Sequence, residues 1–164
     1  MFDWQRQKSG SGSETLPAEV RISKATDADV AEVYVLEREC FPAPWKREFF
    51  ESEVRASGRF NLVARDSRGS LIGYLFGMHF LDEMHINKIA VAESHRRHGI
   101  ATILMERCFE FARERHLRSI SLEVREMNQG AQDFYRRLAF HDSYRRPRYY
   151  PDGEAAVVMT RSMG

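Results

Sequence analysis

The 164-residue sequence has only two cysteines and no long apolar run. Cys40 and Cys108 lack metal-ligand spacing and each falls in a helical apolar pattern, so buried thiols are expected rather than a disulfide or a nucleophile. No segment reaches the roughly 18 apolar residues of a membrane-spanning helix. The first 14 residues also lack the apolar core and cleavage site of a secretion signal. These absences favour a cytoplasmic protein with no membrane partner.

The sequence also has little net charge. Lys and Arg total 25 against 24 Asp and Glu, which leaves +1 and argues against binding of a polyanion by the whole chain. Two arginine groups could still form a basic patch, Arg136 with Arg137 and Arg145 with Arg146 and Arg148. Arginines divided between a helix and a hairpin are more often a solvated face, so no direct recognition of nucleic acid is expected.

The six histidines form no metal-binding motif, so no metal site is expected. His95 and His98 flank two arginines, and the others, His85 among them, are scattered along the chain. Surface or loop positions are predicted for them.

Length and composition predict one folded domain. Residues 1–15 are rich in Ser, Gly and charge and should form a disordered tail. With 43% apolar residues overall, the rest of the chain, 16–164, can bury a single core.

Hydrophobic periodicity predicts seven strands and four helices in this part of the chain. Strands are expected at 20–22, 60–65, 71–80, 86–91, 120–125, 141–145 and 155–160, and helices at 30–40, 46–56, 100–115 and 131–138. The order indicates an α/β fold of the α+β sandwich type. Its central sheet of about seven strands should be mixed and mostly antiparallel, flanked by helices, with one parallel crossover through helix 100–115.

The most informative stretch is 85–102, which predicts a strand, a basic loop and the start of a helix. A helix that begins at Gly99 leaves backbone N–H groups unpaired, and Arg96 and Arg97 add two positive charges. This is suited to a phosphate or pyrophosphate, although an ordinary strand-to-helix turn with a solvated loop remains an alternative. The loop has neither the Lys-Ser/Thr ending of a P-loop nor the three glycines of a dinucleotide fold, which disfavours nucleotide hydrolysis and hydride transfer.

Three other positions are candidates for chemistry. Glu123 lies on the polar face of strand 120–125, where an exposed carboxylate or a partner for Arg125 is the plainer interpretation. Tyr135 lies on a helix face, a common place for an aromatic ring with no catalytic role. The segment Phe41-Pro42-Ala43-Pro44-Trp45 is a stiff loop whose rings either line a substrate site or pack in the core.

These segments together resemble known acetyltransferases. The sequence Arg96-x-x-Gly99-x-Ala101 resembles the acyl-coenzyme A pyrophosphate loop of the GNAT superfamily of N-acetyltransferases. The sequence Leu122-Glu123-Val124-Arg125-x-x-Asn128, followed by Tyr135 and by 146–151, resembles the RimI-type N-terminal acetyltransferases that modify a ribosomal protein on its alanine. The loop 41–45 also resembles that subfamily, so the similarity extends from about Val20 to Met159.

The resemblance implies a GNAT fold, acetyl-coenzyme A (acetyl-CoA) as co-substrate, no metal, and a protein N-terminus, most simply that of a ribosomal protein, as partner. It implies that Glu123 is the general base and Tyr135 the general acid. Acetyl-CoA would bind to Ile89, Ala90, Val91, Arg96, Arg97, His98, Gly99, Ile100, Ala101, Thr102 and Asn128. The acceptor would bind to Phe41, Trp45, Tyr149 and Tyr150.

The sequence departs from the subfamily pattern at three positions. Ala101 replaces the commoner glycine, Met127 replaces a serine, and Ala155 replaces an aspartate expected near the acceptor. The last bears on the identity of the acceptor more than on the reaction. Acetylation of a lysine or a small amine by the same fold, and a non-catalytic acyl-CoA-binding module, are therefore the alternative functions.

Overall fold

The computed structural model of the protein describes residues 19–164, so the tail expected at 1–15 lies outside the described residues. The strands are β1 Arg21–Lys24, β2 Arg59–Arg65, β3 Leu71–Phe80, β4 Glu83–Val91, β5 Ser119–Arg125, β6 His141–Arg146 and β7 Ala156–Ser162. The helices are α1 Val30–Cys40, α2 Arg47–Arg55, α3 Ile100–Glu114 and α4 Gln129–Arg137. The order of elements predicted from periodicity is confirmed, with ends that differ by a few residues.

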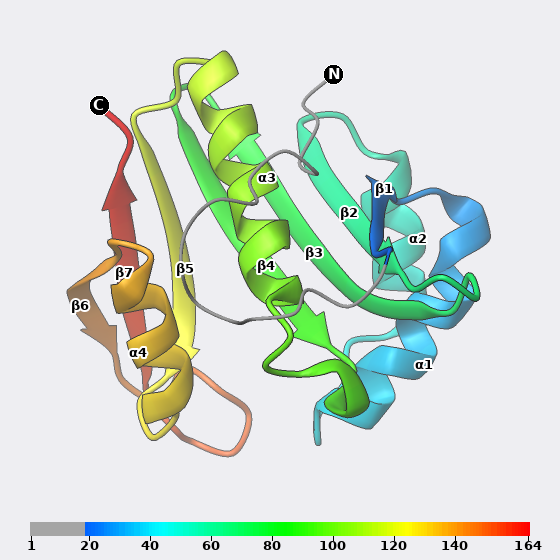
Figure 1. Cartoon of the computed structure of the whole chain (residues 1–164). Helices are drawn as coiled ribbons and strands as arrows, with labels where there is room; N and C mark the ends of the chain where they lie inside the picture. Colours follow the sequence, from blue (N-terminus) through cyan, green and yellow to red (C-terminus); the bar gives the residue numbers. More distant parts are fainter. Residues whose placement is uncertain (1–18) are drawn as a thin grey trace.

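The strands form one sheet in the order β1-β2-β3-β4-β5-β7-β6 (Figure 1). Every neighbouring pair is antiparallel except β4 and β5, which are parallel and joined through α3. The mixed, mostly antiparallel sheet with one parallel crossover is therefore confirmed.

Helices cover both faces of the sheet, as a two-sided core requires. On one face, α3 and α4 pack against the alternate residues Ile120, Leu122 and Val124 of β5. On the other face, α1 and α2 pack against Tyr74 and Phe76 of β3. Figure 1 shows α3 and α4 in front of the sheet and α1 and α2 at its other side. Because α1 and α2 pack on β2, β3 and β4, the β5 end of that second face is left to loops.

The parallel pair separates halfway along its length. Pairing of β4 with β5 runs from Glu83 with Ser119 to Ile86 with Leu122 and ends there. β4 then contains a bulge at Asn87, since Gly77 of β3 pairs with Ile86 and Phe76 pairs with Lys88. A bulge bends its strand and increases the local twist. Beyond it, β4 pairs only with β3 and β5 only with β7, and Figure 1 shows the two strands separating toward Val91 and Arg125.

Both cysteines are free thiols. Cys108 is buried as predicted, whereas Cys40 is only half-buried at the end of α1. Within residues 19–164, no helix combines the length and hydropathy needed to span a membrane.

Candidate active site

Glu123 is the first residue of β5 beyond the last pair with β4. Its carboxylate oxygen Oε2 lies 2.7 Å from Nε2 of His85, and its side chain is 12% exposed. The other oxygen, Oε1, lies 3.8 Å from Nε of Arg146 on β6. The point where the strands separate therefore holds a carboxylate with one close hydrogen-bond donor and one more distant cation.

His85 corrects the prediction that the histidines occupy surface or loop positions. It lies on β4 directly across from Ser121, whose Oγ is 3.0 Å from His85 Nδ1. Nδ1 of His85 thus forms a hydrogen bond with the Ser121 hydroxyl, and Nε2 of the same ring faces the Glu123 carboxylate. The alternative interpretation of Glu123 as a partner for Arg125 is also wrong. Arg125 pairs with Asp152 and Glu154 instead.

Tyr135 lies on α4 with its side chain buried in the core on the α3 side of the sheet. Burial raises the pKa of this phenol, and Tyr150 nearby raises it further. The hydroxyl makes no hydrogen bond to any residue in the range 19–164. Tyr135 therefore keeps its proton at neutral pH and has it available for donation.

The loop between β6 and β7 carries Tyr149 and Tyr150. Their rings pack edge to face, with centroids 5.0 Å apart. Arg125 at the end of β5 stacks over the Tyr150 ring at 4.1 Å and bonds to Asp152 at 2.8 Å and to Glu154 at 3.2 Å. Burial raises the pKa of Tyr150 to about 12, opposed by Arg125 and assisted by Tyr149 and Glu123. One arginine thus ties this loop to the strand that carries Glu123.

The loop between α1 and α2 carries Phe41 and Trp45, both half-buried against the core on the α1 side. Their rings lie around the ammonium group of Lys88 on β4, at 3.8 Å from the Phe41 centroid and 4.5 Å from that of Trp45. The two rings are thus partly core residues, in line with the plainer interpretation of this loop, and partly exposed.

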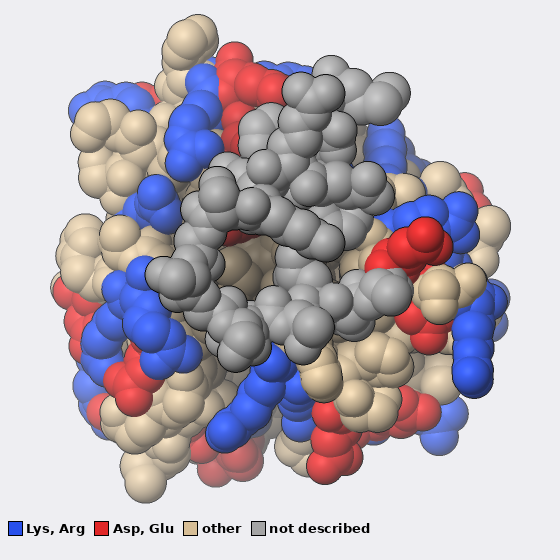
Figure 2. Space-filling view, viewed as in Figure 1, with Lys and Arg blue, Asp and Glu red and all other residues tan. Residues whose placement is uncertain are grey.

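The basic loop before α3 ends at the first turn of that helix. Gly99 is the N-cap of α3 with φ +80°, and Arg97 has φ +63°. The N–H groups of Ile100, Ala101 and Thr102 donate to no backbone or side-chain acceptor of residues 19–164. Figure 2 shows Lys and Arg side chains below the centre of the view, where Figure 1 places this loop.

The two arginines of this loop differ. Arg96 donates through Nε to the Val91 carbonyl at 3.1 Å and approaches Cys40 Sγ through Nη2 at 3.7 Å, so it fixes the loop to β4 and α1. Arg97 is exposed and makes no hydrogen bond or ion pair within the described part of the chain. Arg97 and the neighbouring His98 are therefore both exposed at the start of α3.

The end of β4 has backbone groups that no neighbouring strand pairs with, although one of them, the Val91 C=O, accepts from Arg96 Nε. Ala92 N–H bonds to Ile72 on the β3 side, so alternation points the N–H and C=O groups of Val91 and Ile89 away from β3. No strand pairs with them there, because pairing with β5 ended at Ile86. Ala90, between them, points its backbone groups toward β3.

Asn128, another residue of the expected cofactor site, caps a helix. Its Oδ1 accepts the Ala131 N–H at 3.1 Å at the start of α4.

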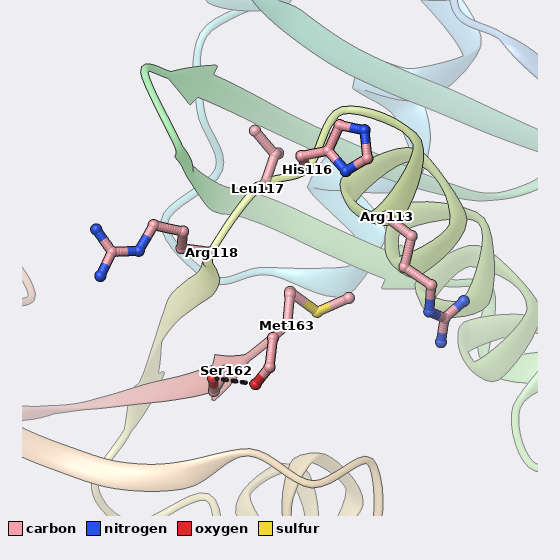
Figure 3. A pocket seen from close by; sticks show the side chains of 7 residues that line it. Arg113, His116, Leu117, Arg118, Ser162 and Met163 are labelled. Carbon is pink, nitrogen blue, oxygen red and sulfur yellow. Dashed lines mark hydrogen bonds between the residues drawn. The ribbon is translucent and has the colours of Figure 1, made fainter.

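A pocket lies at the opposite end of α3 and β5 (Figure 3). It is lined by Arg113, His116, Leu117, Arg118, Ser162, Met163 and Gly164. None of these residues belongs to the expected site. In residues 19–164, His, Cys, Asp and Glu side chains form no group that could hold a metal ion.

The chain has well-defined relatives. It is 28% identical over 141 residues to the ribosomal protein bS18-alanine N-acetyltransferase of Escherichia coli. The aligned region covers 84% of this chain and 94% of that protein. It is 29% identical over 154 residues to an N-alpha-acetyltransferase of Sulfurisphaera tokodaii, which covers 86% and 92%. The crystal structure of the Escherichia coli ribosomal-protein alanine N-acetyltransferase superposes with a TM-score of 0.83 at 27% identity, over 89% of this chain and 95% of that one.

Residues 30–140 match the description "Acetyltransferase (GNAT) family", a range that includes the basic loop, Glu123 and Tyr135. The match covers more than half of the chain, and the fold and the enzyme class that the sequence predicted are both confirmed. The chain belongs to the GNAT family of acetyltransferases.

Proposed function

We propose that this enzyme transfers the acetyl group of acetyl-CoA to the N-terminal α-amine of a protein, with the N-terminal alanine of a ribosomal protein as the first candidate. The observation that carries the proposal is the position of Glu123. Its carboxylate lies where β4 and β5 separate, 3.8 Å from Arg146, which precedes the loop that carries Tyr149 and Tyr150. The basic loop follows the same end of β4, so the proposal brings a proton acceptor, an anion site and an acceptor site to one end of the sheet.

Glu123 acts as the general base. An amine attacks a thioester only when neutral, so its ammonium form must first lose a proton. The Glu123 carboxylate accepts that proton, and the contact with His85 at 2.7 Å fixes the orientation of the carboxylate.

Tyr135 acts as the general acid. The thiolate of coenzyme A leaves as the carbon–sulfur bond breaks, and a proton donor stabilises it. Because burial raises the pKa of Tyr135, its hydroxyl is protonated at neutral pH and gives its proton to the thiolate.

The start of α3 binds the pyrophosphate of acetyl-CoA. Three unpaired amide groups and the positive end of the helix dipole favour an anion there, and Arg97 adds a free charge. Ile89 on the exposed side of β4 offers backbone groups to the pantetheine arm, as a strand would to its neighbour. Acetyl-CoA supplies the activated acetyl group, and the side chains of the protein supply the proton transfers.

A protein N-terminus suits this site better than a lysine. An α-amine ionises near pH 8 and a lysine above 10, so a carboxylate neutralises the α-amine more easily. Phe41, Trp45, Tyr149 and Tyr150 provide rings on two loops, which favours an extended peptide end. Both relatives at 28% and 29% identity are named for this class of acceptor, and the Escherichia coli protein for alanine on a ribosomal protein. A ribosomal acceptor implies a cytoplasmic location.

The test is acetylation of paired peptides. One peptide begins with alanine and contains no lysine; the second has the same sequence with a blocked N-terminus and one internal lysine. We expect mass spectrometry to detect acetylation of the first at a rate at least ~10-fold above the second, because of the difference in amine ionisation. Equal rates would replace the N-terminal function with lysine acetylation.

A second measurement separates an enzyme from an acyl-CoA-binding module. Release of free thiol from acetyl-CoA should require the amine acceptor and follow its concentration. Binding of acetyl-CoA without thiol release in the presence of any peptide would indicate the non-catalytic alternative.

A further inference from the structure

A buried ion pair lies beside the expected acceptor site and takes no part in the chemistry proposed above. Glu37 on α1 is fully buried, and its Oε1 lies 2.9 Å from Lys88 Nζ. The same oxygen accepts the backbone N–H of Trp45 at 3.1 Å. The Tyr74 hydroxyl donates to Oε2 of the same carboxylate. One carboxylate thus connects α1, β3, β4 and the loop between α1 and α2.

The ammonium of Lys88 also contacts two rings of the loop between α1 and α2 (residues 41–46), which we call the acceptor loop. It lies 3.8 Å from the centroid of Phe41 and 4.5 Å from that of Trp45. Both distances are within the range of a cation–π interaction, which strengthens when the cation is desolvated. The Lys88 side chain is 15% exposed, so most of its surface is in contact with protein.

Lys88 lies on β4 close to His85, the residue that contacts the proposed base Glu123. The bulge at Asn87 pairs His85 with Met78 and Lys88 with Phe76, so His85 and Lys88 occupy successive positions on one face of the sheet. His85 contacts Glu123, and Lys88 contacts Phe41 and Trp45. One face of one strand therefore carries both the partner of the proposed base and the support of the acceptor loop.

We propose that Lys88 is a positioning residue for the amine acceptor: its ammonium, fixed by Glu37, holds the Phe41 and Trp45 rings in the place where they contact the first residues of the acceptor. The inference deepens the proposed function and depends on it for the location of the acceptor. A cation between two rings fixes their separation, and the prolines on either side of Ala43 restrict the loop between them. Small displacements of groups that orient a substrate have large effects on its use.

The first experiment compares Lys88→Met with the double variant Glu37→Gln, Lys88→Met. Both remove the cation, but only the first leaves an unpaired buried carboxylate. We expect both to raise the KM of the acceptor about tenfold, with kcat and the Kd of acetyl-CoA within about twofold of the parent enzyme. The double variant should recover part of the thermal stability that Lys88→Met loses.

Arg59→Met is the matched control. Arg59 pairs with Glu53 at 2.6 Å, and this ion pair joins α2 to β2 away from the aromatic rings of the acceptor loop. Its loss should lower the Tm and leave the acceptor KM unchanged. A wild-type KM in the double variant would show that Lys88 only neutralises Glu37, and would overturn the inference.

A second readout does not depend on activity. In a Trp4→Phe background, Trp45 is the only tryptophan. Removal of the ammonium beside its ring should raise the acrylamide quenching of Trp45 fluorescence in the double variant, and Arg59→Met should leave it unchanged. Equal quenching in the double variant and its parent would contradict a role of Lys88 in holding this ring.

The two proposals fail in different ways. The acceptor in these assays is whichever amine the unmodified enzyme acetylates fastest. Failure of the N-terminal function would therefore be seen in the unmodified enzyme as a preference for a lysine peptide. Failure of the Lys88 inference would be seen only in the variants.

Discussion

Two glutamates on the same side of the sheet have opposite surroundings. Glu37 is fully buried and has three donors, namely Lys88 Nζ, the Trp45 N–H and the Tyr74 hydroxyl. Glu123 is partly exposed, with one close donor on a histidine and an arginine at 3.8 Å. A carboxylate whose oxygens are all engaged by donors that keep their protons can only support structure. A partly exposed carboxylate with a free lone pair can accept a proton.

Tyr74, one of the donors to Glu37, is held in its protonated form. Burial raises the pKa of the Tyr74 phenol, and the negative charge of Glu37 raises it further. A buried charge of this kind is tolerated only when paired and fully hydrogen-bonded. Three variants test the contrast between the two carboxylates, and a fourth tests the loop before α3 for comparison.

The largest effect is expected from Glu123→Gln. The amide cannot take the proton of the ammonium, so kcat should fall by ~10²-fold or more while acetyl-CoA binds as before. The deficit should shrink above about pH 8, where an α-amine is already neutral. Steady-state kinetics across pH would measure this, with Glu126→Gln, whose exposed carboxylate pairs with Arg145, as control. Full activity of Glu123→Gln at neutral pH would leave that carboxylate a structural role.

The second effect is on stability. Glu37→Gln leaves the Lys88 ammonium without its counter-charge in the interior, which should cost about 3 kcal/mol in the free energy of unfolding. Urea denaturation would measure it. Glu123→Gln should lose less than about 1 kcal/mol in the same assay, because its carboxylate is not fully buried. Equal losses would remove the distinction between the two sites.

Gly99→Val changes the anion site and neither carboxylate. Because Gly99 has φ +80°, a β-branched side chain adds backbone strain and crowds the approach of a phosphate. We expect about tenfold weaker binding of acetyl-CoA by calorimetry. Gly69→Val is the control, since Gly69 has φ +82° in the turn between β2 and β3. Unchanged affinity in a folded Gly99→Val protein would exclude this loop as the pyrophosphate site.

The smallest effect is expected from His85→Gln. Its amide can still donate to Glu123, so kcat/KM should fall only about threefold, the scale of one net hydrogen bond. His79→Gln, against Phe111 on the other side of the sheet, is the control. A loss as large as that of Glu123→Gln would make His85 the proton acceptor.

Sequence patterns predicted much of this fold because the signals were local. Alternation of Ile120, Leu122 and Val124 placed Glu123 on the opposite face of β5, and the start of α3 at Gly99 followed from one glycine after a basic loop. The parallel crossover followed from the order of elements, since a strand-helix-strand unit joins parallel strands.

The contacts of the site were not predictable in the same way. The His85–Glu123 contact depends on the register between β4 and β5, which no local pattern specifies. Arg125 is two residues from Glu123 but pairs with a loop 27 residues away along the chain. Lys88 and Glu37 are charged residues within apolar segments, and only the packing of α1 on β4 shows that each neutralises the other.

The bulge in β4 makes the bend of this strand independent of the face on which its side chains lie. Because side chains alternate between the two faces of a strand, a deletion elsewhere in β4 would move every side chain beyond it to the opposite face. Asn87 has no partner in the register with β3, so its deletion would keep His85 and Lys88 on one face and remove only the bend. The curvature of this strand is thus encoded by one residue, independently of the side chains that the strand displays.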